Sequence, residues 1–568
     1  MRFIVIAVLV ILSNISISWL FNQPQDVGED VPEGKLNSLS FAPFREGQSP
    51  LEEKFATEAQ IDEDLRLLAD KTHTIRTYSS AENMFVTPKL AGKYGLNMIQ
   101  GAWLGYGKKD NNEEIEALID AANTYPDVIK RVIVGNEVLL RGDLKPEQVL
   151  EYIRRVKQAV KQPVSYADVW SMYLKHPELI KEVDFITIHI LPYWEDEPIP
   201  VEEAPGHIDR IYKQVRAEAD EIAPGKPILI GESGWPGKGR QRGSAVPSIV
   251  NEAMFIRGLI KVATENGFDY NIVEAFNQPW KSNLEGVVGA NWGLYSSERK
   301  EVFPLTGPVY ENDDWYERCI FSSLFLLMAA FAFRKQLLTL DWQIVLGYLV
   351  FAQILGVLLI VQIDELFYTS YSHWQRFITL AGALFNAALS GLILFKLINQ
   401  LTQNVIHPKL GNWLYRIFFV FGAFALYKTM GLAINGRYIS FPVELAAIPV
   451  ISLIALIFAH FWASKQLSIK SLSIENLIGT DINRINNDTW LGYALLVMAP
   501  ILVFGESYAF FVARDLIQAY PGTAERIRVA LSFALGNQQL VMWLVCLLII
   551  ALPFLYPLNS TKEEIDQP

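Results

Sequence analysis

The amino-acid sequence predicts an α/β fold, a (β/α)8 TIM barrel, joined to an all-α multi-pass membrane domain. Three observations lead to this prediction. Residues 36–312 alternate short apolar runs with amphipathic stretches, residues 317–558 hold one long apolar run after another, and residues 3–21 form a separate uncharged apolar segment. Alternating β-runs and helices are typical of a parallel sheet covered by helices, and about 20 apolar residues are enough to cross a bilayer.

The composition supports two modules of different kinds. Of the 568 residues, 51% are apolar, which is high for a single soluble domain. Residues 22–316 carry 47 of the 61 acidic side chains and 32 of the 49 basic ones, so this part of the chain is acidic. Because no basic face dominates it, no nucleic-acid partner is expected. Cys319 and Cys546 both fall in apolar runs, so the sequence does not predict a disulfide framework.

Residues 1–22 are expected to form an N-terminal transmembrane signal anchor. The apolar run is longer than the core of a cleaved signal peptide, and no small-x-small cleavage site follows it. Arg2 precedes the run and acidic residues follow it, so Arg2 is predicted to stay inside and the next module to be exported. The Pro-containing, acidic segment 23–35 is interpreted as a tether.

The barrel is predicted over residues 36–312 from eight β-runs. The stretches between the runs have apolar residues at spacings of three and four with charges opposite, which is typical of helices that cover a sheet. The runs are residues 36–44, 73–79, 95–105, 131–137, 162–170, 183–191, 227–233 and 270–278. Eight such units fit a (β/α)8 barrel, in which the active site lies at the C-terminal ends of the strands.

The C-terminal membrane domain is predicted to cross the bilayer about seven times between residues 317 and 558. The expected spans are residues 317–333, 342–363, 377–398, 413–434, 441–463, 490–513 and 538–558. If the barrel is exported, this alternation places Arg334 and Lys409 inside and makes residues 559–568 a cytoplasmic tail. An interfacial helix within residues 520–540 is the alternative for the end of the domain.

Two glutamates stand at the ends of predicted barrel strands. The seventh run reaches Gly231 and Glu232, and residues 233–236 (Ser-Gly-Trp-Pro) cannot continue a strand. About a hundred residues earlier, Glu137 ends the fourth run and is preceded by Asn136. Glycosidic chemistry needs two such carboxyl groups, one as a proton donor and one as a nucleophile or base. The competing interpretation is a salt-bridged pair at the rim of a barrel.

The motifs GNE at residues 135–137 and GESGWP at residues 231–236 resemble glycoside hydrolase family 17, the β-1,3-glucanases and β-glucan transglycosylases. The resemblance covers residues 36–310 and implies that Glu137 is the acid/base and Glu232 the nucleophile. It further implies a set of substrate-binding or supporting residues, with Trp235 lining the sugar path. This set is Arg76, Tyr78, Asn136, His189, Tyr193, Trp235, Trp280 and Lys281.

The chain departs from the plant members of the family at three positions. Leu191 replaces a tyrosine in the sixth run, Gln278 stands where a glutamate is usual near the lysine, and Gly289 replaces an acidic residue. These changes leave both catalytic glutamates in place. The resemblance therefore does not by itself imply the hydrolytic behaviour and subsite geometry of the plant enzymes.

The layout of one N-terminal span, a barrel and a multi-pass region is similar to bacterial membrane-bound proteins described as β-(1→6)-glucan synthases or branching transglycosylases. It implies a retaining β-glucan glucanosyltransferase in the bacterial inner membrane, with the barrel in the periplasm and β-1,3-linked glucan as the substrate. Water or a sugar hydroxyl can resolve the same glucosyl-enzyme, so the acceptor, including the formation of β-1,6 branches, is left open. A membrane-anchored β-1,3-glucanase and a non-catalytic glucan-binding or export partner are the alternatives.

The expected partners follow from this interpretation. They are a β-glucan polysaccharide or oligosaccharide, the lipid bilayer, and a glucan synthase or export complex. The seven histidines form no cluster with ligand spacing, so the sequence predicts neither a metal site nor a cofactor.

Overall fold

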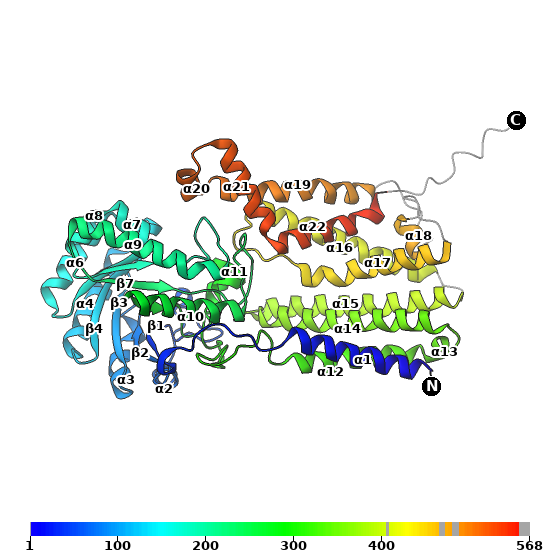
Figure 1. Cartoon of the computed structure of the whole chain (residues 1–568), viewed down its shortest axis with the longest axis horizontal. Helices are drawn as coiled ribbons and strands as arrows, with labels where there is room; N and C mark the ends of the chain where they lie inside the picture. The colour runs from blue at the N-terminus through cyan, green and yellow to red at the C-terminus, as the bar shows by residue number, and fades with distance from the viewer. Residues whose placement is uncertain (1, 405–407, 465–471, 480–487, 556–568) are drawn as a thin grey trace. The chain divides into compact units, whose positions relative to one another are not determined.

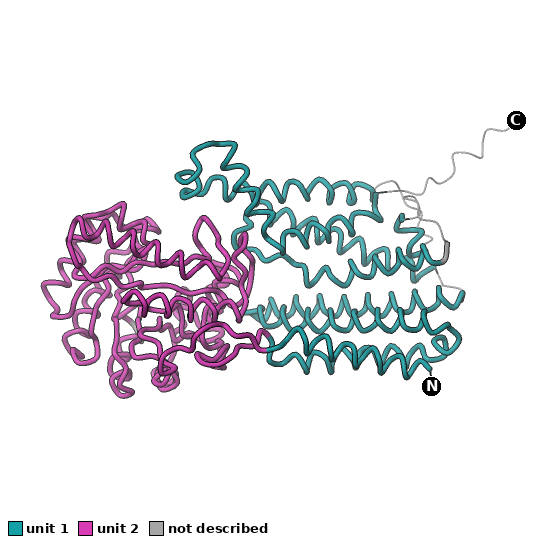
Figure 2. Tube along the Cα trace, viewed as in Figure 1, with its two compact units in different colours: residues 1–23, 312–568 teal, residues 24–311 magenta. Residues whose placement is uncertain are grey.

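The computed structural model of the chain describes residues 2–404, 408–464, 472–479 and 488–555. The chain divides into two compact units, one of residues 24–311 and one of residues 1–23 and 312–568 (Figure 2). The expected cytoplasmic tail, residues 559–568, lies outside the described residues.

The unit of residues 24–311 is a closed barrel of parallel strands in which each strand pairs with its sequence neighbours and β8 pairs with β1 (Figure 1). The strands are β1 (Leu36–Ser40), β2 (Thr72–Arg76), β3 (Asn97–Ala102), β4 (Ile129–Asn136), β5 (Val164–Val169), β6 (Ile186–His189), β7 (Ile228–Ser233) and β8 (Asp269–Ile272). The α-helices of this unit are α2 (Glu58–Leu68), α3 (Thr87–Lys93), α4 (Lys108–Thr124), α5 (Val138–Arg141), α6 (Pro146–Ala159), α7 (Trp170–Lys175), α8 (Pro177–Glu182), α9 (Ala204–Ile222), α10 (Ile249–Asn266) and α11 (Ser282–Gly289). The predicted (β/α)8 fold class is confirmed.

Burial explains why these runs form a barrel. Every residue of β6 and β7 is buried, as expected for parallel strands with one face in the barrel interior and the other under helices. Helix α6 buries Val149, Ile153 and Val156 and carries charged residues between them. The parallel register brings the C-terminal ends of the strands to one rim, where His189 of β6 pairs with Glu232 of β7.

Residues 23–35, expected to form a tether, contact the barrel at some of their residues, although most of the segment is exposed. Gln25 and Val309 form an antiparallel bridge with two backbone hydrogen bonds of 2.8 and 2.9 Å. Val27 and Val31 are 3% and 2% exposed. Two apolar side chains four residues apart are thus buried within an otherwise acidic stretch, and the role of residues 23–35 as a tether stays a prediction.

The second unit is helical. Its α-helices are α1 (Arg2–Phe21), α12 (Trp315–Ala332), α13 (Arg334–Leu337), α14 (Trp342–Tyr368), α15 (His373–Leu401), α16 (Pro408–Ile434), α17 (Val443–Ser464), α18 (Ile474–Ile478), α19 (Thr489–Phe511), α20 (Arg514–Ala519), α21 (Thr523–Gly536) and α22 (Gln538–Ala551). Within the described residues, seven helices including α1 are long and apolar enough to cross a membrane. Helices α21 and α22 pass that test only as a pair, bent by 74° at their junction.

Buried polar side chains join the helices of this unit. Gln353 of α14 donates a hydrogen bond to Ser322 Oγ of α12 (3.1 Å), and Asn14 of α1 donates to the same oxygen (3.4 Å). Trp543 Nε1 of α22 donates to Thr429 Oγ1 of α16 (3.0 Å). Polar groups among apolar helices need internal partners. Helix α1 is therefore an integral part of the bundle, although about 300 residues separate it from α12 in the sequence.

Candidate active site

Glu137 directly follows β4 and has an unusual backbone conformation. Its φ of 52° and ψ of 29° lie in the left-handed region, which residues other than glycine rarely adopt. Its N–H donates to the carbonyl of Ala167 in β5 (2.8 Å), and Arg141 donates to the carbonyl of Asn136 (2.5 Å). The surrounding hydrogen bonds thus hold the turn that places the Glu137 carboxyl group at the rim.

Glu232 lies near the end of β7 and is 8% exposed. Arg76, the last residue of β2, donates from Nη1 to Glu232 Oε1 (3.1 Å) and to the carbonyl of Gly231 (2.6 Å). Its Nη2 donates to Asn136 Oδ1 (2.6 Å). One buried guanidinium therefore connects the ends of β2, β4 and β7 and gives Glu232 a charged hydrogen-bonding partner.

His189 lies between the two glutamates. Its Nδ1 is 2.8 Å from Glu137 Oε1, and its Nε2 is 3.6 Å from Glu232 Oε1. One ligand atom from each of the three side chains lies within 4.8 Å of the other two. Carboxyl groups about 5 to 5.5 Å apart are typical of retaining glycosidases, whereas inverting enzymes separate them by about 6.5 to 9.5 Å. The short separation favours the retaining geometry.

The charges around Glu232 favour its ionised form. Burial alone would raise the pKa of this carboxyl group, but His189, Arg76 and Lys281 together hold the pKa below its ordinary value. An ionised carboxylate in a largely buried position is suited to act as a nucleophile.

Asp168 of β5 has a different environment. It is fully buried, and its carboxylate accepts hydrogen bonds from the Tyr166 hydroxyl and the Val169 N–H. Burial raises the pKa of Asp168 to about 6, and the negative charge of Glu137 acts in the same direction. Sequence reasoning missed this residue, although an aspartate inside the apolar run 162–170 was a usable signal.

Lys281 and Glu274 form an ion pair behind the nucleophile. Lys281 Nζ donates to Glu274 Oε1 (2.7 Å). Burial raises the pKa of the Glu274 carboxyl group. Burial by itself would lower the pKa of Lys281, but the nearby carboxylates, Glu274 first among them, raise it above its ordinary value. Tyr78 stands 4.9 Å from the Arg76 guanidinium, measured to the ring centroid, and burial raises the pKa of its hydroxyl well above the ordinary value. Glu274 was also missed from the sequence, where it interrupts the apolar run before NQPWK.

The other three tyrosine and tryptophan residues of the predicted set have different environments. Tyr193 and Trp235 are both fully buried and pack edge to face, with ring centroids 6.0 Å apart, and Trp235 Nε1 donates to the carbonyl of Val246 (2.9 Å). The prediction that Trp235 lines the sugar path is therefore wrong, because its ring has no open face and fills space below the rim. Trp280 is partly exposed and donates from Nε1 to Gln278 Oε1 (2.9 Å).

An exposed aromatic side chain outside the predicted set stands near Glu137. Trp103 directly follows β3 and is 44% exposed. The Arg141 guanidinium lies 4.5 Å from a ring centroid of Trp103 and also donates to the carbonyl of Leu104 (2.9 Å). Because Arg141 is bonded to the residue before Glu137 as well, it holds the indole close to the turn that carries this glutamate. An indole held in this way can stack on a sugar ring.

Glu137, His189 and Glu232 are also residue types that can bind a metal ion. Some of their ligand atoms are already engaged within the site, since His189 Nδ1 pairs with Glu137 and the Glu232 carboxylate accepts from Arg76, whereas His189 Nε2 is buried without a hydrogen-bond partner among the described residues. A cation bound to all three would have the Arg76 guanidinium as a close neighbour of the same sign. These contacts do not favour a metal site, and the expectation of none stays a prediction.

Comparisons with known proteins place the barrel among glycoside hydrolases. Residues 38–293 match the family model described as the BtgE/BtgC glycoside hydrolase domain. The glucan 1,3-beta-glucosidase of Arthroderma benhamiae is 27% identical over 273 residues, which cover 45% of this chain and 87% of that protein. The enzyme of the same name from Schizosaccharomyces pombe is 27% identical over 249 residues, 41% of this chain and 77% of that protein. The crystal structure of a family 17 beta-1,3-glucanosyltransferase from Rhizomucor miehei aligns with 26% identity and a TM-score of 0.41, covering 47% of this chain and 95% of that one.

Proposed function

We propose that this chain is a retaining glucanosyltransferase for β-1,3-linked glucan and that its barrel is that of a glycoside hydrolase of family 17, a class of enzyme that acts on O-glycosidic bonds. The match of residues 38–293 to the BtgE/BtgC glycoside hydrolase domain supports this proposal. The names of the fungal relatives support this substrate class. The proposal depends most on the close approach of two carboxyl groups: one oxygen of Glu137 and one oxygen of Glu232 lie within 4.8 Å of each other. The Arg76 guanidinium donates to Glu232 beside them.

In the first step of the proposed reaction, a Glu232 oxygen attacks the anomeric carbon of a glucosyl unit. Glu137 gives its proton to the departing glycosidic oxygen, so that bond breaks and a covalent glucosyl-enzyme forms. Arg76 and Lys281 stabilise the negative charge of Glu232 before the attack and after its later release.

In the second step, Glu137 removes the proton of an incoming hydroxyl group, whose oxygen displaces Glu232 from the anomeric carbon. Two displacements leave the β-configuration unchanged. A sugar hydroxyl as acceptor gives a longer or branched glucan, with a β-1,6 branch if the 6-hydroxyl attacks, whereas water gives hydrolysis. The acceptor thus separates the transferase from a β-1,3-glucanase.

Product analysis of the detergent-purified full chain with β-1,3-gluco-oligosaccharides tests this proposal, with Glu232→Gln as the matched inactive control. Products longer than the substrate, absent from the control, are expected, and linkage analysis then shows whether β-1,6 bonds form. Only shorter products would establish the glucanase instead. A wild-type protein as inactive as the control on these substrates would overturn the proposed activity.

We further propose that the helical unit spans a bacterial inner membrane and that the barrel lies on the periplasmic side. The seven long apolar helices and the position of Arg2 before α1 support this placement. A glucan synthase or export complex would be the class of partner that supplies polymer there.

Cysteine labelling in spheroplasts tests the orientation, since the two natural cysteines are buried. A membrane-impermeant maleimide is expected to label Glu298→Cys in the barrel without permeabilisation and Lys335→Cys after α12 only with it. The reverse pattern, or equal labelling of the two variants in sealed spheroplasts, would overturn the orientation.

A further inference from the structure

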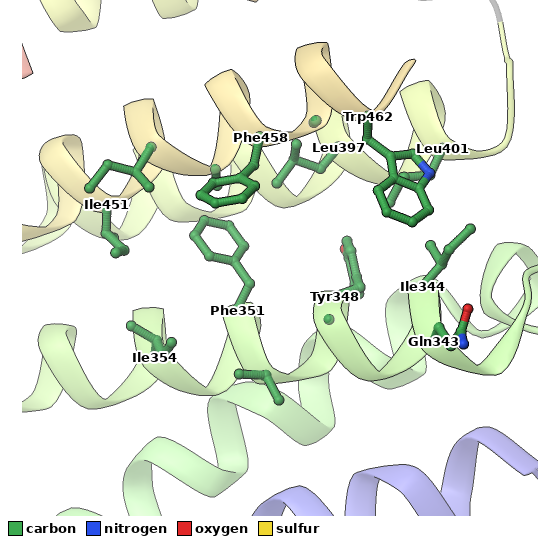
Figure 3. Close-up of a pocket in the computed structure, with 15 residues that line it drawn as sticks. Gln343, Ile344, Tyr348, Phe351, Ile354, Leu397, Leu401, Ile451, Phe458 and Trp462 are labelled. Carbon is green, nitrogen blue, oxygen red and sulfur yellow. The ribbon is translucent and has the colours of Figure 1, made fainter. Parts of the chain in front are cut away.

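Helices α14 and α17 leave an open apolar groove between them, next to the end of α15 (Figure 3). This α14–α17 groove has a volume of about 690 Å³, within the range of about 300 to 1,000 Å³ that is usual for ligand pockets. Phe351 of α14 and Phe458 of α17 face each other across it. The lining residues are Gln343, Ile344, Gly347, Tyr348, Val350, Phe351 and Ile354 of α14, Leu397 and Leu401 of α15, and Ile451, Ile454, Ala455, Phe458, Ala459 and Trp462 of α17.

Hydrogen bonds join α14, α15 and α17 beyond one end of the groove, on the side of Ile354 and Ile451. Asn386 of α15 donates from Nδ2 to Gln362 Oε1 of α14 (2.7 Å) and to the carbonyl of Leu445 in α17 (3.0 Å). These bonds hold α14 and α17 together near Gln362 and Leu445. Towards the start of α14 and the end of α17, the two helices line the groove with facing stripes of side chains.

The length of the groove matches one leaflet of a bilayer. The lining residues run from Gln343 to Ile354 on α14 and from Ile451 to Trp462 on α17. At 1.5 Å per residue, each stripe is about 17 Å long. Half of the hydrocarbon core of a bilayer is about 15 Å. A hydrocarbon chain that enters at the open end would therefore end close to the bilayer midplane.

The chemistry of the wall suits a hydrocarbon chain. The Tyr348 hydroxyl is engaged by the carbonyl of Leu394 (3.1 Å), and Gln343 lies at the open end. Phe458 and Trp462 are 70% and 58% exposed, so large aromatic surfaces in the groove are left uncovered by the protein. Water does not occupy an apolar groove favourably, whereas an acyl chain would gain dispersion contacts along both walls.

Two basic residues shortly precede α14, whose first turns line the open end of the groove. Arg334 and Lys335 begin the short helix α13, and the preceding Phe333 packs edge to face against Tyr348 in the groove wall (6.1 Å between centroids). Both basic residues are exposed and form no ion pair within the described part of the chain, and Asp341, which precedes α14, is the acidic residue nearest to them in the sequence. The excess of positive charge favours an anionic headgroup.

We propose that the α14–α17 groove binds one acyl chain of an anionic phospholipid, whose phosphate lies beside Arg334 and Lys335. This site rests on the membrane insertion proposed above and not on the glucan chemistry of the barrel. The bound lipid fills the space between α14 and α17 that the protein leaves open.

The chain offers a matched pair of substitutions. A Cβ atom added at Gly347 in the groove, or at Gly391 on an exposed part of α15, meets no heavy atom within 4 Å. Phenylalanine at either position replaces a helix-interior glycine with a better helix former, so neither change should prevent folding. Gly347→Phe blocks the groove, whereas Gly391→Phe leaves it open.

Photo-crosslinking of the full chain in vesicles with a phosphatidylglycerol that carries a diazirine on one acyl chain tests the site. Peptides that contain residues 343–354 and 451–462 are expected to be labelled in the wild type and in Gly391→Phe, and several-fold less in Gly347→Phe. Equal labelling of these peptides in all three proteins would overturn the groove assignment. Labelling of no helix at all would overturn membrane insertion together with it.

A headgroup comparison tests the anionic part of the proposal. Phosphatidylethanolamine with the same diazirine chain is expected to label the groove several-fold less than phosphatidylglycerol, and Arg334→Gln with Lys335→Gln should remove this preference. Equal labelling by the two lipids in the wild type, or a preference that the double variant keeps, would overturn the assignment of the headgroup.

Discussion

Arg76 is the residue whose replacement tests the site most directly. Its guanidinium donates to the carboxylate of Glu232, to the carbonyl of Gly231 and to the amide oxygen of Asn136. Arg76→Met keeps most of the length and apolar stem of the side chain but removes the charge and all three hydrogen bonds. Arg76→Lys keeps the charge and loses the fork that reaches two strands at once.

The expected loss follows from these contacts. A preorganised donor to a reacting group in a buried site contributes about 3 to 4 kcal/mol, so Arg76→Met should lower kcat/KM about 100-fold to 1,000-fold. Arg76 is one of the charges that hold the pKa of Glu232 down, so its removal raises that pKa. Because Glu232 must be ionised to attack, the acidic limb of the pH profile of kcat/KM should move to higher pH. Arg76→Lys should keep more of the wild-type limb.

The assay is the initial rate of reducing-end release from laminari-oligosaccharides between pH 4 and 8, with far-UV circular dichroism to show that each variant is folded. A folded Arg76→Met protein with kcat/KM within about threefold of the wild type and an unmoved acidic limb would refute the reasoning, because that result would leave the guanidinium without an electrostatic role at Glu232.

Three further predictions concern other parts of the barrel. Asp168 binds its proton more tightly in the folded state, because its pKa is about 6 there. The free energy of unfolding should therefore fall by about 3 kcal/mol as the pH rises from about 4 to 6. Asp168→Asn should flatten this part of a Tm-against-pH curve, and an unchanged curve would contradict the raised pKa. Trp103→Ala should lower transfer to oligosaccharide acceptors several-fold relative to hydrolysis, while cleavage of an aryl β-glucoside changes little; an equal loss of both would indicate a structural role. Val31→Ala should lower the Tm of the barrel by about 3 °C, by calorimetry, because truncating a buried side chain costs about 2 kcal/mol, and an unchanged Tm would contradict the packing of this segment on the barrel.

The strands and the two glutamates could be predicted because their signals are local. Each β-run is a short apolar segment that ends at residues unable to continue a strand, as at residues 233–236 after Glu232. In a parallel barrel all such ends lie at one rim. Residues separated by about a hundred positions, such as Glu137 and Glu232, could therefore be brought together without knowledge of a single contact.

The remaining features depend on packing that periodicity does not encode. Trp235 follows Glu232 in a motif that suggests a sugar platform, yet its ring is fully buried against Tyr193. Val27 and Val31 lie in a stretch of charged and turn-forming residues and are nevertheless buried, in a segment whose Gln25 bridges to Val309. In both cases the deciding partner is distant in the sequence.

The environments of the two glutamates support different roles for two identical side chains. Glu232 has the positive charges of Arg76 and Lys281 around it, and its carboxylate accepts a hydrogen bond from Arg76. Glu137 is more exposed, with its side chain at 23% against 11% for Glu232, and its Oε1 lies 2.8 Å from His189 Nδ1. Fixed positive charge favours a side chain that remains ionised until it attacks, which is the role proposed for Glu232. Because Arg76 ends β2 and Lys281 lies in the segment after β8, this asymmetry is a property of the whole rim.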